Sequence, residues 1–347
     1  MPPSPPGNSR APALFTLAVA VFALSACGGG DDQGGDTGLG RAALPERTDA
    51  TLVLDFVPNA VHTGIYCALA NGYYEQNNVE LEIIEPTSTS DTLKLIDQGR
   101  AAFGIADGID VGQQIDRGLG AKAIMALVQR PLGGVITLEE SGIRSPSELE
   151  GRTVGVTGVP SDEAVLDTVV SDDGGDPGRV DEVTIGFNTV PALQSGRVDA
   201  ITGFPPADGT AIEERGEAVR SFPLDEWGGP RYPGLVVFSI EERIERDPAL
   251  MRAFVDATLR GYEDTIDDPD RCLNALVDRA PEIDRELAEA QLEAYLPLFE
   301  AGSDGYGMLD QGALEDLSAF LSDTDLADEP IPSRRFASNE FVKQGER

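Results

Sequence analysis

The chain has 347 residues, of which 61 are acidic and 26 basic, so its formal net charge is −35. This excess of negative charge disfavours nucleic acids and anionic lipid surfaces as partners, because both are bound through basic patches. The three cysteines form no CxxC motif, and the one histidine has no cysteine cluster beside it. We therefore expect no bound metal.

Residues 1–27 have the pattern of a bacterial lipoprotein signal peptide. Arg10 precedes an apolar stretch that is too short for a comfortable membrane span. The motif Leu-Ser-Ala-Cys then predicts lipidation of Cys27, the alternative being an ordinary signal peptide with an incidental cysteine. The Gly-rich residues 28–49 are expected to form a flexible tether. We therefore expect an exported domain, lipid-anchored to the outer face of the bacterial cytoplasmic membrane.

From residue 50 onward, short β-rich runs alternate with helical segments, and after residue 241 only helical patterns remain. This alternation predicts an α/β architecture with mostly parallel sheets. The expected strands are 51–56, 79–84, 102–106, 121–128, 134–138, 153–156, 182–187, 199–203 and 235–240. The expected helices are 60–72, 90–98, 108–117, 161–171, 190–196, 207–215, 248–266, 270–279, 284–296 and 311–321.

The length of the mature chain exceeds what one core usually organises, so two lobes are expected. Residues 50–135 together with 236–347 are predicted to form lobe 1, and residues 136–235 lobe 2. Two crossover strands would join the lobes as a hinge, and a ligand would bind at the carboxyl ends of the strands. Cys67 and Cys272 either pair in a disulfide or stay free and buried.

The first strand–helix connection carries several candidate binding residues. Asp55 and Phe56 end the strand, and Asn59 is the expected cap of the helix. Phe56 either stacks on a planar ligand or belongs to the core, and Asn59 either contacts a heterocycle or only caps. The lone histidine, His62, is a candidate base, metal ligand, binding-site wall or helix cap. Tyr66 is a further aromatic candidate.

The later strand ends add hydroxyl and carboxyl groups. Thr87 and Ser88 lie in a hydroxyl-rich loop that either binds a polar ligand or only starts a helix. Asp107 and Asp110 follow the third strand, and one of them is expected to face the ligand. Tyr232 forms an aromatic wall or packs the hinge.

The turn GVTGVPSDEAVL (155–166) looks like an anion cradle, because glycines precede Ser161 at the start of a helix. Asp162 and Glu163 in the first helical turn would repel a bound phosphate or sulfonate. A neutral ligand that contacts Thr157 and Ser161 fits this turn better.

Five stretches, in this order, resemble the SsuA/thiamine-pyrimidine (NMT1-like) family of solute-binding proteins, which also contains the fungal pyrimidine synthase. The resemblance implies a type-2 periplasmic-binding fold and delivery of a small ligand to an ABC importer. The stretches are LDFVPNAVHTGIYCALANGYYEQNNVELEIIEP (54–86), SDTLKLIDQGRAAFGIADG (90–108), LEGRTVGVTGVPSDEAVL (149–166), LQSGRVDAITGFPPADG (193–209) and ASNEFV (337–342).

The resemblance also allows an enzyme to be weighed against a binder. It implies that the synthase uses a lysine bearing pyridoxal phosphate and a reactive histidine, at positions that read Ala106 and Asp110 here. The synthase's cysteine-rich iron motif falls near residues 229–239, which contain no cysteine. Without the lysine the cofactor cannot be attached. We therefore expect a binding protein without a cofactor, and not an enzyme.

The family pattern places an acidic residue at Asp208, although this chain has Asp-Gly where the family has Glu-Gly. A carboxyl group there can pair with an aminopyrimidine through two parallel hydrogen bonds, or it is a solvated aspartate after a proline turn. The family's reactive histidine belongs at Asp110, which argues against a catalytic role for His62, and metal ligation lacks a cluster of partner ligands. Contact with the ligand or capping of the turn remains for His62.

We expect a monomeric solute-binding protein that delivers a pyrimidine-type thiamine precursor, such as hydroxymethylpyrimidine or a formylaminopyrimidine, to a permease and its ATPase. Riboflavin or another flavin-like heterocycle is the alternative. An alkanesulfonate or nitrate is disfavoured, because Arg130 and Arg231 are the only cations expected near the cleft. The expected ligand-binding residues are Asp55, Phe56, Asn59, His62, Tyr66, Thr87, Ser88, Asp107, Asp110, Thr157, Ser161, Asp208 and Tyr232.

Overall fold

The computed structural model describes residues 42–299 and 305–342. The expected signal peptide, Cys27 and most of the tether lie outside these residues. The end of the expected tether is part of the folded domain: Leu44 is buried, and its backbone N–H donates to the Asn77 carbonyl at 3.1 Å. Within the described ranges, every helix is too short or too polar to cross a membrane.

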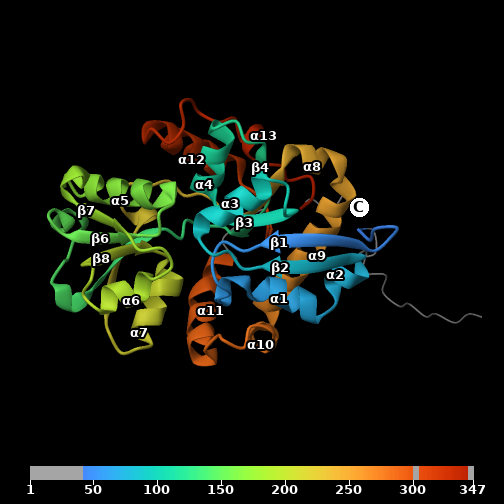
Figure 1. The fold of residues 1–347 in the computed structure, drawn as a ribbon, viewed down its shortest axis with the longest axis horizontal. Helices are drawn as coiled ribbons and strands as arrows, with labels where there is room; N and C mark the ends of the chain where they lie inside the picture. The colour runs from blue at the N-terminus through green and yellow to red at the C-terminus, as the bar shows by residue number, and fades with distance from the viewer. Residues whose placement is uncertain (1–41, 300–304, 343–347) are drawn as a thin grey trace, which may run out of the picture. The chain divides into compact units, whose positions relative to one another are not determined.

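Two five-stranded sheets organise the described residues (Figure 1). Sheet A has the strand order β2-β1-β3-β10-β4, and sheet B has the order β7-β6-β8-β5-β9. β10 in sheet A and β5 in sheet B run antiparallel to both of their neighbours, so each sheet is mixed. The strands are β1 (Thr48–Val53), β2 (Val79–Ile84), β3 (Phe103–Asp107), β4 (Ala121–Val128), β5 (Gly134–Leu138), β6 (Thr153–Val156), β7 (Asp181–Thr184), β8 (Ala200–Gly203), β9 (Val219–Pro223) and β10 (Leu235–Ile240).

Helices cover both faces of the sheets (Figure 1). α3 and α4 lie on one face of sheet A, and α1 and α9 on the other; α5 covers one face of sheet B, and α6 and α7 the other. The helices are α1 (Thr63–Ala70), α2 (Tyr73–Gln76), α3 (Thr89–Asp97), α4 (Gly108–Asp116), α5 (Pro160–Asp172), α6 (Thr189–Gln194), α7 (Thr210–Glu213), α8 (Glu241–Arg246), α9 (Pro248–Asp267), α10 (Pro269–Arg279), α11 (Arg285–Phe299), α12 (Gln311–Asp323) and α13 (Ser333–Phe336).

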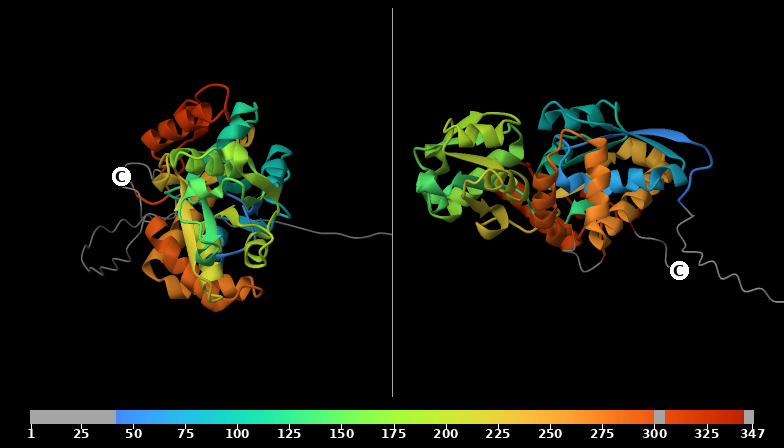
Figure 2. Two further views of the ribbon diagram at one scale, coloured as in Figure 1. Left: turned by 90° about the vertical axis from the view of Figure 1, so that its left-hand side faces the viewer. Right: turned by 90° about the horizontal axis from the view of Figure 1, so that it is seen from below.

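The chain passes between the sheets twice, after β4 and again before β10. Figure 2 shows the segment of sheet B, in green and yellow, beside the blue and orange elements of sheet A. We call the part built on sheet A lobe 1 and the part built on sheet B lobe 2. This architecture confirms the predicted fold of two α/β lobes with two crossover segments and additional C-terminal helices.

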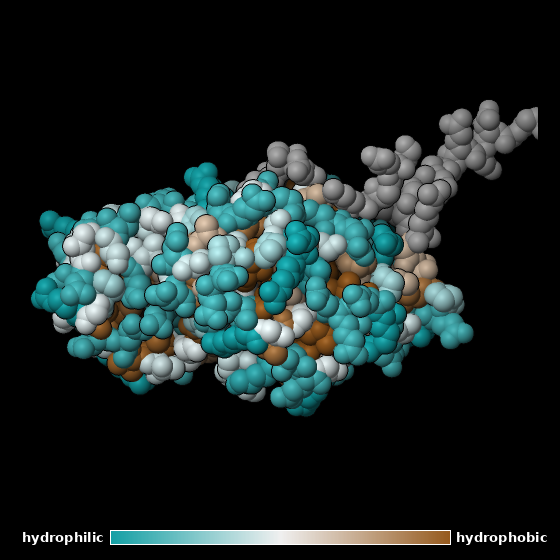
Figure 3. Space-filling view, turned by 90° about the horizontal axis from the view of Figure 1, so that it is seen from above, coloured by the Kyte–Doolittle hydropathy of each residue, from teal (hydrophilic) through white to brown (hydrophobic). Residues whose placement is uncertain are grey.

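The apolar runs of the sequence form the core between the sheets and their helices. β3 and β5 are buried at every residue, as expected for strands that are covered on both faces. Phe103 of β3 stacks on Phe254 of α9 with 3.8 Å between ring centroids. On the face seen in Figure 3, hydrophilic residues predominate, with smaller apolar areas among them. Among the described residues, Val57 and Val183 are the large apolar side chains that remain exposed.

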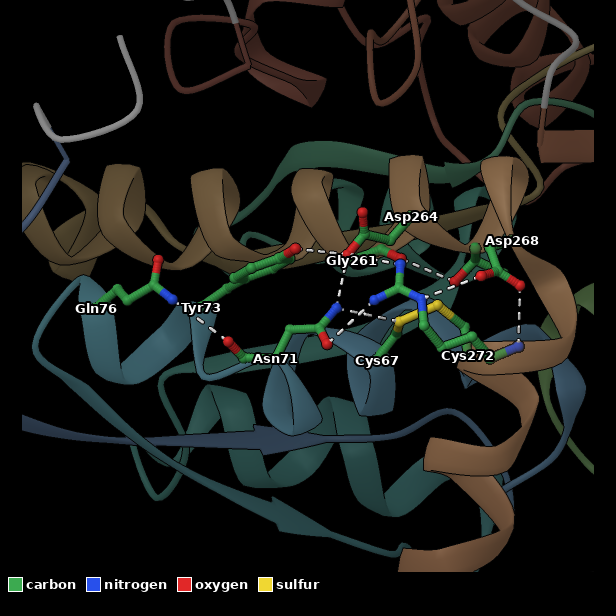
Figure 4. Close-up of polar contacts among 10 residues, drawn as sticks. Cys67, Asn71, Tyr73, Gln76, Gly261, Asp264, Asp268 and Cys272 are labelled. Atoms are coloured by element: carbon green, nitrogen blue, oxygen red, sulfur yellow. Dashed lines mark hydrogen bonds and ion pairs between the residues drawn. A yellow bond between two sulfur atoms is a disulfide. The ribbon is translucent and has the colours of Figure 1, made fainter. Parts of the chain in front are cut away.

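A disulfide joins Cys67 of α1 to Cys272 of α10, which answers the question that the sequence left open (Figure 4). Beside it, Asp264 of α9 accepts hydrogen bonds from the Asn71 side-chain amide and the Tyr73 hydroxyl, both at 2.6 Å. These contacts fix α1 against the C-terminal helices covalently and through charge-assisted hydrogen bonds.

Removing the disulfide should lower the free energy of unfolding by about 3 kcal/mol, because the cross-link restricts a long loop of the unfolded chain. Urea unfolding of the double variant Cys67→Ala/Cys272→Ala measures this loss. A reductant should destabilise the wild type similarly and leave the variant unchanged. Equal stability of variant and wild type would show that the cross-link contributes nothing.

Candidate functional site

A cleft lies between the two lobes, at strand ends of both sheets. The space between its walls is about 910 Å³, a figure that includes open solvent at the mouth. The structure brings eight of the predicted site residues together in its lining: Asp55, Phe56, Asn59, Asp107, Asp110, Thr157, Ser161 and Asp208.

The other five predicted site residues do not line this cleft. His62, Tyr66 and Tyr232 are buried in the protein interior. The Thr87 hydroxyl donates to the Asp91 carboxylate, and the Ser88 hydroxyl contacts that of Ser90 at 3.2 Å. The hydroxyl-rich loop therefore uses these two side chains to begin α3, which is the plainer of the two expectations for it.

The connection between β1 and α1 folds around His62. The Asn59 backbone N–H donates to His62 Nδ1 at 3.2 Å, and the Asn59 side chain accepts from the Val61 N–H at 3.0 Å. Since Nδ1 is an acceptor, the hydrogen must be on Nε2, which donates to Asp55 Oδ1 at 2.8 Å. His62 is fully buried and lies next to Asp55. Of the two roles that the sequence left for His62, the structure shows capping of this turn, and its ring is not among the cleft-lining side chains.

Phe56 lies at the cleft in contact with Phe187, which follows β7 in lobe 2. Their ring centroids are 4.2 Å apart in an edge-to-face arrangement. Phe56 is half-buried and belongs to the cleft lining. This pair joins the two lobes across the cleft, and sequence reasoning did not identify Phe187.

Asp107 and Asp110 belong to the first turn of α4. Asp107 caps the helix by accepting from the Ile109 N–H at 2.8 Å, and it also accepts from the Tyr232 hydroxyl at 3.1 Å. Asp110 accepts from the backbone N–H of Ser161 at 3.1 Å and from its hydroxyl at 3.0 Å. The two contacts between Asp110 and Ser161 connect α4 of lobe 1 to the first turn of α5 in lobe 2.

Burial makes both of these carboxyl groups weak acids. Burial, followed by the charge of Asp162, raises the pKa of Asp110 to about 7. Burial and then the charge of Asp110 raise the pKa of Asp107 well above its usual value. Ionisation of these two neighbouring carboxyl groups is therefore less favourable than that of an exposed aspartate.

The turn before α5 is occupied by its own acidic residue. Asp162 Oδ2 accepts from the Thr157 hydroxyl at 2.7 Å, from the Gly158 N–H at 2.8 Å and from the Val159 N–H at 3.2 Å. Asp162 Oδ1 accepts from the Thr202 hydroxyl at 2.8 Å. A carboxylate thus takes the amides that a phosphate cradle would offer. Asp162 lines the cleft, a place that sequence reasoning did not assign to it.

Asp208 lies in the turn after β8 and lines the cleft from lobe 2. Its Oδ1 accepts from the Thr189 hydroxyl at 2.7 Å, and its Oδ2 accepts from the Phe204 N–H at 2.9 Å. Burial raises the pKa of Asp208. The carboxyl group is only partly exposed, and hydrogen bonds within lobe 2 hold both of its oxygens.

The rest of the lining is mainly apolar. From the sequence, these residues could be expected only in the hydrophobic core. No Arg or Lys is among the cleft-lining residues in the described part of the chain. Arg130 and Arg231 instead approach the carboxylate of Asp225 at 3.7 and 3.6 Å. Residues 42–299 and 305–342 also contain no group of three or more side chains placed to hold a metal ion. The main apolar liners are Val61, Leu93, Ile105, Val159, Val165, Phe204 and Leu235.

Two α/β lobes with a cleft at their strand ends define the type-2 periplasmic-binding-protein fold. Among solved structures, the alkanesulfonate-binding protein SsuA from Xanthomonas axonopodis pv. citri, bound to MOPS, is similar with a TM-score of 0.68 and 14% identity. The match covers 85% of this chain and 100% of that chain. At this identity the similarity supports the fold alone.

The chain belongs to the NMT1/THI5-like family, whose model matches residues 59–272. It is 29% identical to the formylaminopyrimidine-binding protein of Halalkalibacterium halodurans over 92% of this chain and 95% of that protein. It is 28% identical to the 4-amino-5-hydroxymethyl-2-methylpyrimidine phosphate synthase of Legionella pneumophila over 73% of this chain and 80% of that protein. The resemblance stated from the sequence is thereby confirmed, and the family includes proteins named as binders and as synthases.

Proposed function

We propose that this protein is the extracytoplasmic solute-binding component of an ABC importer and captures a pyrimidine-type thiamine precursor between its lobes. The observation that carries the proposal is the cleft, which combines the half-buried ring of Phe56 with carboxyl groups and apolar walls. An aminopyrimidine is planar and offers N–H donors, so it complements an aromatic ring and carboxylate acceptors. The similarity to a formylaminopyrimidine-binding protein, over nearly the whole chain, supports the same ligand class.

The charges of the cleft weigh against anionic ligands. Sulfonate, nitrate and phosphate sites generally use convergent Arg or Lys side chains. The described lining contains none of these, and it contains five aspartates: Asp55, Asp107, Asp110, Asp162 and Asp208. An alkanesulfonate would therefore lose its hydration without gaining a counter-charge.

The same cleft favours binding over synthesis. The resemblance places the cofactor lysine and the reactive histidine of the synthase at Ala106 and Asp110. Ala106 lines the cleft with a methyl group, and Asp110 bonds to Ser161. Neither side chain can attach pyridoxal phosphate through an imine. The protein thus delivers its ligand unchanged.

The disulfide supports an exported location for the protein. Structural disulfides persist in oxidising compartments and are rare in the cytosol, and both Cys67 and Cys272 are buried side chains. Together with the lipoprotein motif ending at Cys27, this supports a lipid-anchored domain outside the cytoplasmic membrane. There it would pass its ligand to a permease and the associated ATPase.

Isothermal titration of refolded, ligand-free protein tests the ligand. Formylaminopyrimidine or hydroxymethylpyrimidine should bind at least about 100-fold more tightly than riboflavin or an alkanesulfonate, because two wrongly paired buried polar groups cost on the order of 1.5 kcal/mol each. If riboflavin bound most tightly, a flavin would replace the pyrimidine as the proposed ligand. Tightest binding of the sulfonate, or a covalently attached pyridoxal phosphate in purified protein, would overturn the proposal.

A further inference from the structure

In four of the five cleft aspartates, both carboxylate oxygens lie within hydrogen-bond distance of donors from the protein itself. Asp110 and Asp208 each receive one donor per carboxylate oxygen. Asp162 receives three donors on one oxygen and one on the other. Asp107 receives the Ile109 N–H and the Tyr232 hydroxyl, with both oxygens within 3.3 Å of a donor. Each of these four therefore has a protein donor group within hydrogen-bond distance of both oxygens, although Asp107 shares the one Tyr232 hydroxyl hydrogen between its two.

Asp55 is the exception in this cleft. Its Oδ1 accepts from His62 Nε2 at 2.8 Å, and its Oδ2 accepts no hydrogen bond from any residue in the described part of the chain. The residue is only 6% exposed, yet it lines the cleft. Since this oxygen is not one of the fully buried side-chain atoms that lack a partner, it is open to the cleft, where a donor from outside the protein would complete its hydrogen bonding.

His62 determines how Asp55 presents this oxygen. The imidazole is held at both nitrogens, by the Asn59 N–H and by Asp55 itself. A fixed N–H donor on one carboxylate oxygen prevents the group from rotating and leaves the other oxygen available. The adjacent side chain, Phe56, lies in the same cleft.

A second unsatisfied polar group lies within electrostatic range of Asp55. The Tyr295 hydroxyl is buried and has no hydrogen-bond partner in the described structure. Burial, and then the charges of Asp55 and Asp208, raise the pKa of Tyr295 well above its usual value.

We propose that Asp55, positioned by His62, is the specificity-determining acceptor of the cleft and receives an N–H donor of a planar amino-substituted heterocycle that stacks on Phe56. The proposal rests on the proposed function in that the ligand is a small heterocycle. The proposal goes beyond that function by assigning recognition of the amino group to Asp55. Asp208 is not assigned this role, because both of its oxygens already accept hydrogen bonds from the protein.

The first experiment needs only the wild-type protein and three small probes. 4-Amino-2-methylpyrimidine, its analogue with a methyl group in place of the amino group, and the corresponding 4-oxo compound are titrated by calorimetry. The amino compound should bind about 100-fold more tightly than either analogue, because the methyl group gives Asp55 no donor and the oxo group turns an acceptor toward it. Equal binding of the amino and methyl compounds would overturn the proposal without any variant. Failure of all three to bind would count against the proposed function itself.

Variants at Asp55 then assign the preference to this residue. Asp55→Ala should bind the amino and methyl compounds equally. Asp55→Asn should reverse the preference in favour of the 4-oxo compound, because His62 retains the amide oxygen and the amide N–H₂ faces the ligand. Asp316→Asn, at an exposed position of α12, is the matched control and should behave as the wild type. Retention of the amino preference by folded Asp55→Ala would contradict the assignment.

The positioning role of His62 has its own test. His62→Phe fills the space without a donor, and His62→Gln retains an N–H that can reach Asp55. The amino preference should fall about tenfold in His62→Phe and return in His62→Gln, because only the donor fixes the carboxylate. A change in thermal stability with an unchanged amino preference would show that His62 is merely structural.

Discussion

Replacing Gly261 by alanine should lower the free energy of unfolding by about 3 kcal/mol, at the upper end of overpacking effects, and replacement by valine should prevent folding. Gly261 lies inside α9, where α1 crosses it (Figure 4). A Cβ at this position would lie 2.1 Å from the Gly64 carbonyl oxygen and 2.7 Å from the Ala68 Cβ. Backbone atoms cannot move aside as a flexible side chain would, so the two helices must separate.

Helix propensity alone predicts the opposite sign for this substitution. Alanine in a helix interior is favoured over glycine by about 1 kcal/mol. Urea unfolding therefore distinguishes close helix contact from propensity. Gly120→Ala is the control, because a Cβ there first meets another atom at 3.7 Å and should cost little. A Gly261→Ala protein as stable as the wild type would show that α1 and α9 do not touch as described.

Replacing Asp110 by asparagine should raise the free energy of unfolding of the ligand-free protein by about 4 kcal/mol at pH 8. The pKa of Asp110 is raised from 3.8 to about 7 by burial. Between these values the folded state keeps a proton that the unfolded state releases, so this group lowers stability as the pH rises from about 4 to 7. Asparagine stays neutral and can retain both contacts to Ser161.

The free energy of unfolding of variant and wild type should be compared from pH 4 to pH 8. The gain from Asp110→Asn should shrink as the pH falls toward 4, because the wild-type carboxyl is then protonated in both states. Asp107 and Asp208, whose pKa values are also raised, keep part of the same pH dependence in the variant. Asp316→Asn should give no such profile. A gain from Asp110→Asn that is independent of pH would refute the buried-carboxyl explanation.

Strongly patterned segments of this fold could be predicted from the sequence almost to the residue. β2 spans Val79–Ile84 as expected, and α10 spans Pro269–Arg279 against an expected 270–279. β9 (Val219–Pro223) was missed, because only Phe222 in it is fully buried and it lies at the edge of sheet B. Such a strand lacks the apolar pattern from which strands are recognised. The helix expected over 207–215 is a π-helical turn at Pro205–Gly209 followed by the short α7.

The site was predictable where it depends on strand ends, and not where it depends on contacts between lobes. Asp55, Asp107 and Asp208 were expected at the cleft because each follows a strand, and they line it. The bond between Asp110 and Ser161 joins residues 51 positions apart in different lobes. No local pattern reports such a contact, since it depends on how the two lobes meet.

The link between Cys67 and Cys272 also affects how the protein survives damage. It closes a covalent loop across a sequence separation of 205 residues, and every strand of sheet B lies inside that loop. A single proteolytic cut anywhere between the two cysteines would open the loop but leave both pieces in one covalent molecule. A nicked domain would therefore keep its second lobe attached, and the two halves of its cleft could still meet.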